Sequence, residues 1–162
     1  MFKYPGNKRE KEQSTNRDIN SNKLDNNISR ARNKIYEYAA CNEWEYFVTL
    51  TLDKAKYDRY DLAKYIKDLG KWINNGRRNG RNLKYLLIPE PHKNGAWHMH
   101  GLMNGLRSED IRQFQLNEKL PDRVRQMIKE GRVIYDIPEY RKKFGYVTVE
   151  KVINQDAIAK YV

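Results

Sequence analysis

Cysteine is almost absent from the sequence, since Cys41 is the only one among 162 residues. A single thiol excludes an intrachain disulfide and a thiolate zinc cluster within one chain, so histidine and carboxylate side chains must hold any metal ion. No apolar run approaches the ~20 residues of a membrane span, and the polar start carries no signal-peptide core. We therefore expect a cytoplasmic protein that does not enter a membrane.

Large apolar side chains are scarce at the N-terminus, where Phe2, Ile19 and Leu24 are the only Leu, Ile, Val or Phe residues in 1–24. Such a polar segment cannot bury a core, and we expect a disordered or weakly ordered basic arm over 1–24 ahead of one domain over 25–162. Basic residues exceed acidic ones by 32 to 21, a formal net charge of +11. This excess suits a nucleic-acid partner, because contacts to phosphates release condensed counterions.

The pattern of apolar residues predicts an α+β fold with helices on one face of an antiparallel sheet. Asp58 or Asp61 can cap the strongest predicted helix, 61–75, whose apolar stripe includes Ile66. A basic loop is expected to follow over 74–82. Further helices are expected over 25–41, 108–116, 121–130 and 137–145 and from Asn154, and strands over 46–52, 84–90, 96–103, 133–136 and 146–152.

The three histidines of the chain, His92, His98 and His100, all fall within residues 92–100. The Asn-Gly pair at 94–95 predicts a hairpin turn there. A His-x-His pair on the return strand points both imidazoles to the same face of the sheet, within reach of one divalent ion. The hairpin is therefore a candidate metal site.

The register of this hairpin decides whether a carboxylate joins the histidines. A loop made of residues 93–95 pairs His98 with Glu90, so that Glu90 faces the same ion, whereas a strict two-residue turn pairs Glu90 with Met99. Two imidazoles and one carboxylate with open positions suit a catalytic Mn²⁺ or Mg²⁺ ion. Two alternatives stay open at this point: the histidines are solvated on an exposed strand, or His92 replaces Glu90 as the third ligand.

Other residues have the character of a nucleic-acid interface. Tyr57 and Tyr60 alternate with cations and offer faces on which bases can stack. Thr49 and Thr51 share one face of their strand, which is also what a half-buried sheet would show, and Tyr161 lies at a helical spacing typical of core packing. The candidates for phosphate contacts are Arg77, Arg78, Arg81 and Lys84, with a second basic cluster at Arg141, Lys142 and Lys143.

Three segments resemble, in order and rough spacing, the three motifs of HUH endonucleases, specifically the replication initiators of rolling-circle phages and plasmids. These segments are FVTLTLD (47–53), IPEPHKNGAWHMHGLM (88–103) and AIAKYV (157–162). The similarity extends from about Ser29 to Val162. The family's first motif gives Thr49 and Thr51 a supporting place beside the metal ion or the DNA.

The resemblance implies a ferredoxin-like or RRM-like antiparallel sheet of about five strands. It implies a Mn²⁺ or Mg²⁺ ion held by His98 and His100, with Glu90 as the third ligand. Tyr161 would attack a scissile phosphate in single-stranded DNA or an origin hairpin, leaving a 5′-phosphotyrosine and a free 3′-hydroxyl that primes rolling-circle replication. The alternatives are a single-strand transposase of the same chemistry and a non-catalytic nucleic-acid-binding domain.

The third motif departs from the family pattern, in which a lysine usually follows the tyrosine by three residues. The sequence printed here stops at Val162, so we expect a nickase domain truncated at its C-terminal helix. If Tyr161 is not the nucleophile, Tyr146 and Tyr140 are the remaining candidates.

Overall fold

The computed structural model describes residues 8–157, and it confirms the α+β class with a six-stranded antiparallel sheet in place of the expected five or so strands. The strands lie in the order β2-β3-β1-β6-β5-β4. The helices are α1 (Lys8–Ala40), α2 (Leu62–Arg78), α3 (Asp122–Lys129), α4 (Pro138–Lys143) and a 3-10 turn (Ser108–Asp110). The strands are β1 (Tyr46–Thr51), β2 (Lys84–Pro91), β3 (Trp97–Asn104), β4 (Arg112–Gln113), β5 (Tyr135–Asp136) and β6 (Val147–Lys151).

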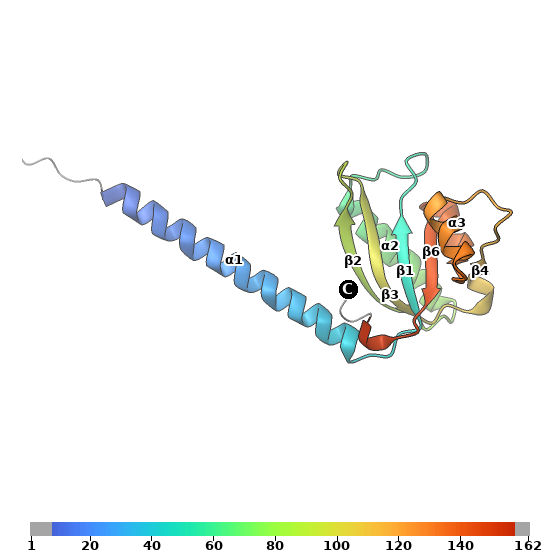
Figure 1. Cartoon of the computed structure of the whole chain (residues 1–162). Coiled ribbons are helices and arrows are strands. Elements are labelled where there is room, and N and C mark those ends of the chain that lie inside the picture. The colour runs from blue at the N-terminus through green and yellow to red at the C-terminus, as the bar shows by residue number, and fades with distance from the viewer. Residues whose placement is uncertain (1–7, 158–162) are drawn as a thin grey trace, which may run out of the picture.

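One face of the sheet carries the main hydrophobic core. Alternate residues of β1, such as Val48 and Leu50, point to this face and are fully buried against α2 and α4. Figure 1 shows α2 lying behind the central strands. The Asp61 carboxylate caps α2 by accepting a hydrogen bond from the Lys64 backbone N–H at 2.9 Å, as the sequence predicted. Ile66 is 50% exposed, so it does not belong to the buried stripe assigned to it.

The opposite face of the sheet is covered only towards its margins. At one margin, Ala39 at the end of α1 packs with Trp44 and with Leu102 of β3. At the other margin, Val124 of α3 belongs to a cluster with Phe114, which precedes the α3 segment. The strands between these two clusters are left to face outwards.

Helix α1 begins at Lys8, earlier than the predicted start at Asp25. Figure 1 shows it projecting from the sheet, and residues 23–38 are exposed except for a half-buried Ile35. Only its last turn, through Ala39, is buried against the domain. The division into a basic arm over 1–24 and a nickase domain over 25–162 stays a prediction.

Two other predicted boundaries differ from the structure. The segment 74–82 is not all loop, because α2 continues to Arg78 through Gly76, where a Cβ atom would meet Leu83 Cδ1 at 2.7 Å. Glycine is tolerated in this helix because the close approach of Leu83 leaves no room for a side chain. The segment 108–116 is not one helix, since the 3-10 turn gives way to β4, which pairs with β5.

The remaining elements lie where the sequence predicted them. Helices α3 and α4 and strands β5 and β6 fall within the expected ranges. Asn154 Oδ1 accepts a hydrogen bond from the Ala157 backbone N–H at 3.1 Å, so Asn154 caps the helical residues 155–157. Across the described part of the chain, no helix is both long and apolar enough to cross a membrane.

Candidate functional site

The hairpin of β2 and β3 has the register that brings Glu90 to the histidines. The His92 N–H donates to the Ala96 carbonyl at 2.8 Å, and the Gly95 N–H donates to the His92 carbonyl at 2.8 Å. Residues 93–95 therefore form the loop, and Glu90 pairs with His98. The prediction of a three-residue loop is confirmed.

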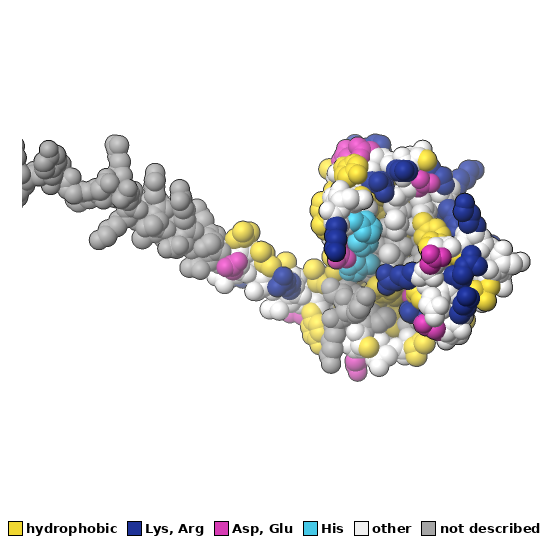
Figure 2. All heavy atoms as spheres, turned by 45° about the horizontal axis from the view of Figure 1, so that its top comes forward, with side chains coloured by type: hydrophobic (Ala, Val, Ile, Leu, Met, Phe, Trp, Pro, Cys, Tyr) yellow, Lys and Arg dark blue, Asp and Glu magenta, His cyan; other side chains and the backbone are white. Residues whose placement is uncertain are grey.

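Three side chains of this hairpin converge on one point. Glu90 Oε2 lies 3.3 Å from His98 Nε2 and 3.2 Å from His100 Nδ1. One ligand atom from each residue lies within 4.8 Å of the others, so the group can hold a metal ion. Two imidazole nitrogens and one carboxylate oxygen form a donor set that suits a first-row divalent ion and leaves positions open for substrate. Figure 2 shows the histidine side chains together at the surface of the domain.

The surroundings of His98 favour its neutral, metal-binding form. Burial, followed by the neighbouring His92, lowers the pKa of His98. The two rings stack, with centroids 4.2 Å apart and planes at 26°. His92 itself lies outside the group of three converging ligand atoms, so the geometry favours Glu90 as the third ligand.

The candidate metal ligands lie in two rows that cross the outward face of the sheet. The first row runs from Glu90 through His98 to Thr51. The second row runs through His100 and Thr49 and continues to Thr148 on β6. Because adjacent strands lie about 4.8 Å apart, the two predicted supporting threonines are one strand away from the histidines.

A cleft of about 820 Å³ opens on this face beside the histidines. Its floor is the outward side of β1 and β6, including Thr49, Thr51 and Thr148, and α3 lines it opposite the sheet with Arg123 and Met127. Its size is within the usual range of ligand sites in proteins. The sequence analysis did not find this cleft, although the alternation in YVTVEK (146–151) places Thr148 on the outward face.

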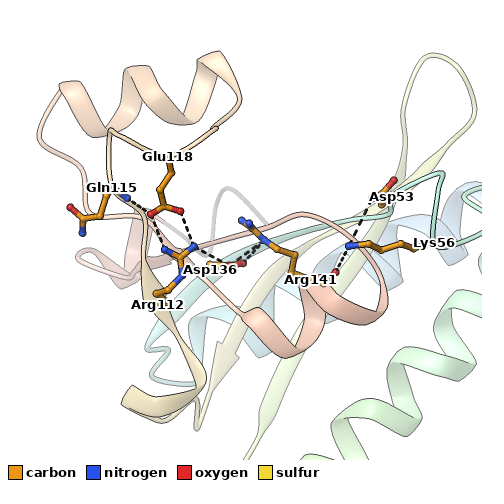
Figure 3. A network of polar contacts seen from close by, with 7 residues as sticks. All are labelled: Asp53, Lys56, Arg112, Gln115, Glu118, Asp136 and Arg141. Atoms are coloured by element: carbon orange, nitrogen blue, oxygen red, sulfur yellow. Dashed lines mark hydrogen bonds and ion pairs between the residues drawn. The ribbon is translucent and has the colours of Figure 1, made fainter.

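An ion-pair network holds together the segments behind α3 (Figure 3). Arg112 binds both carboxylate oxygens of Glu118, at 2.7 and 2.9 Å, and lowers the pKa of Glu118 to about 2. Asp136, whose side chain is 2% exposed, lies 3.1 Å from Arg141 and 3.6 Å from Arg112. The Arg141 guanidinium also lies over the Tyr146 ring, 5.2 Å from its centroid. The network thus joins β4, β5 and α4 to the residue that precedes β6 in the cleft.

The predicted phosphate-binding residues are spread over the domain. The Arg77 Nε donates to the Leu83 carbonyl at 2.9 Å, and Arg81 is paired with Asp110 at 2.7 Å and Glu139 at 3.1 Å. Arg77 and Arg78 form the last turn of α2, and α2 covers the face of the sheet opposite the histidines. Lys84 is exposed at the start of β2, well before Glu90. Their role in DNA binding stays a prediction.

The two predicted stacking tyrosines differ in their surroundings. The Tyr57 hydroxyl donates to Asp68 at 2.8 Å, and burial together with this bond raises the pKa of Tyr57. Tyr60 is 58% exposed, and its ring lies against Gly95 in the turn of the hairpin. Tyr60 is therefore the one of the pair that presents an exposed aromatic face near the histidines.

The predicted nucleophile, Tyr161, lies outside the described residues. Of the other candidates, Tyr140 is fully buried and its hydroxyl lies 2.7 Å from that of Tyr65, so it is inaccessible to a phosphate. Burial raises the pKa of Tyr146 to about 12, which disfavours the phenolate. Neither residue has the surroundings of an activated nucleophile.

Comparison with protein families agrees with this architecture. The family model for the replication-associated protein ORF2/gene II protein matches residues 45–162, a range that contains the sheet, the histidine hairpin and the cleft. The chain belongs to this family. Membership of this replication-associated protein family supports DNA binding and a role in the initiation of rolling-circle replication. Comparisons with curated proteins and with solved structures gave no match.

Proposed function

We propose that this member of the replication-associated protein family is an HUH-type endonuclease that nicks and rejoins single-stranded DNA, or an origin hairpin, to initiate rolling-circle replication. The observation that carries the proposal is the convergence of Glu90, His98 and His100 on one point at the surface of the sheet. A purely structural cluster would gain nothing from two adjacent imidazoles that face one carboxylate at 3.2–3.3 Å. The neighbouring cleft and the formal charge of +11 fit a polyanionic substrate.

The chain's own residues have separate roles in the proposed reaction. His98, His100 and Glu90 would hold Mn²⁺ or Mg²⁺, and a bound divalent ion polarises a phosphodiester and orients it for in-line attack. The Tyr161 oxygen forms a bond to phosphorus, the bond from phosphorus to the 3′-oxygen breaks, and the 3′-oxygen leaves as a hydroxyl with a proton. The 5′-phosphotyrosine retains the energy of the phosphodiester, so a 3′-hydroxyl can later reverse the step and join the strands.

A denaturing gel tests the proposal. The chain, with its native continuation beyond Val162 if one exists, is incubated with labelled single-stranded DNA with and without Mn²⁺. We expect a covalent protein–DNA adduct only with Mn²⁺. Tyr161→Phe should abolish the adduct while leaving Mn²⁺ and DNA binding intact, because it removes a single oxygen.

Each contrary outcome has a defined meaning. An adduct formed by Tyr161→Phe would assign the reaction to another tyrosine. DNA binding without any adduct in the wild-type chain would favour the non-catalytic nucleic-acid-binding domain. An adduct that forms equally well after His98→Ala would remove the metal site from the mechanism.

A further inference from the structure

The cleft beside the histidines has a floor of hydroxyl groups with no partners. The side chains of Thr49, Thr51 and Thr148 are half-buried on the outward face of the sheet, and all three line the cleft. Within residues 23–157, no hydrogen bond to any of these three hydroxyls is found. Half-buried hydroxyls usually have a partner in a native structure, so a row of three without one is a surface prepared to bind something polar.

The rim of the cleft is cationic. Arg132 lies there but is neutralised by Glu150, to which its Nε donates at 3.0 Å. Arg123 on α3 and Lys151 at the end of β6 are exposed and form no ion pair with any other described residue. Two uncompensated cations above a hydroxyl-lined floor fit a ligand that carries both phosphates and hydrogen-bonding edges.

Apolar surface completes the lining. Phe47 of β1 and Met127 of α3 are half-buried and belong to the cleft. Nucleobases combine flat apolar faces with polar edges, and threonine hydroxyls can donate to or accept from any of the four base edges. The cleft therefore has the complementary chemistry for bases as well as for the sugar-phosphate backbone.

Sheet register fixes the place of the cleft relative to the candidate metal site. Thr49 pairs with His100 on one side and with Thr148 on the other. The floor of the cleft thus starts about 4.8 Å from the histidine column and reaches roughly twice that distance at Thr148. A strand whose phosphate lies at the histidines would place its next bases over the threonines.

We propose that this cleft is a base-recognition site, in which Thr49 and Thr148 read the edges of the nucleotides that flank the scissile phosphate, while Arg123 and Lys151 bind the phosphates of the same segment. The proposal rests on the proposed function and deepens it, because it assigns the sequence preference of the nuclease to residues outside the histidine hairpin. α3 would act as the outer wall that confines the strand against the sheet.

Selection from a pool of single-stranded oligonucleotides with randomised sequence tests the hydroxyls. The wild-type chain should enrich particular bases at a few adjacent positions. Thr49→Val and Thr148→Val keep the shape of the side chain and remove the hydroxyl, and each should flatten the preference at one or two of those positions. Ser108→Ala, which removes an exposed hydroxyl outside the cleft, is the matched control and should keep the wild-type preference.

The phosphate contacts are tested by the salt dependence of DNA affinity, measured by fluorescence anisotropy. Arg123→Gln should weaken binding to all sequences alike and reduce the salt slope by about 1. Lys129→Gln, a neutralisation on the same helix at a residue that does not line the cleft, should change neither quantity.

Failure of this proposal is distinguishable from failure of the nuclease proposal. If the threonine variants keep the wild-type preference, if the wild-type chain has no preference, or if Arg123→Gln binds with the wild-type salt slope, the cleft is not the base-recognition site. Mn²⁺ affinity, measured by calorimetry, should be unchanged in all these variants, which shows that the hairpin is intact. Absence of a DNA adduct in the gel assay would instead refute the nicking chemistry and leave the binding results standing.

Discussion

Gly101, the residue after the second candidate ligand histidine, is a point at which one methyl group should disable the metal site from the opposite side of the sheet. Its φ is +155°, a conformation that residues with side chains rarely adopt. A Cβ atom there would lie 2.0 Å from the Leu86 carbonyl oxygen and 3.0 Å from Leu87 Cα, both in the backbone of β2. Contacts between a Cβ and such atoms essentially never fall below 3.0 Å, so β2 and β3 must separate locally by about 1 Å.

The cost of Gly101→Ala follows from these two effects. Forced overpacking of a buried site costs about 1–3 kcal/mol, and holding alanine in a glycine conformation costs about 1–3 kcal/mol. We therefore expect the free energy of unfolding to fall by about 2–5 kcal/mol, a large share of the 5–15 kcal/mol typical of a domain. Because Glu90 lies on β2 and the histidines on β3, the same displacement should weaken Mn²⁺ binding in the molecules that remain folded.

Urea denaturation followed by circular dichroism measures the stability, and calorimetry with Mn²⁺ measures the site. Gly70→Ala on α2 is the control, since no atom lies within 4 Å of the position of its added Cβ. Alanine in a helix should stabilise the protein there by about 0.5–1 kcal/mol. If Gly101→Ala unfolds at the wild-type urea concentration and binds Mn²⁺ normally, the close approach of β2 to β3 does not set the geometry of the site.

Three further predictions concern the hairpin and its support. His98→Ala should abolish Mn²⁺ binding in calorimetry, whereas His92→Ala should retain it; the reverse result would exchange their roles. Without metal, the unfolded chain should take up a proton before the folded one, because burial lowers the pKa of His98; stability should therefore fall as pH drops below about 6.5, and His98→Gln should reduce this dependence in urea titrations. Asp136→Ala should lower the free energy of unfolding by about 2–3 kcal/mol, at or below the low end for a broken buried pair, because its two arginine partners are 34% and 46% exposed and can be rehydrated; an unchanged urea midpoint would contradict this.

The hairpin could be predicted from the sequence because its determinants are local. An Asn-Gly turn, a period of two along the strand and a single choice of loop length fixed which residues face Glu90. The cap of α2 at Asp61 was equally local, since its partner is three residues away. In each case the interacting groups lie within one element or one turn.

The cleft could not be predicted because its two sides are brought together by tertiary packing. Thr148 reaches Thr49 only through the pairing of β6 with β1, and Arg123 reaches the same space only because Val124 packs in a cluster under α3. The continuation of α2 through Gly76 has the same origin, since it depends on contact with Leu83. Glycine alone favoured the loop that the sequence predicted.

The contrast between a local and a distant origin also sets an order for folding. All the candidate metal ligands lie within residues 90–100, so closing one short loop is enough to assemble them, and the entropic cost of closing a loop rises with its length. The floor of the cleft needs β1 and β6, which are separated by most of the domain, and contacts of such high sequence separation form slowly. The metal-binding hairpin can therefore form, and recruit its ion, before the surface beside it exists.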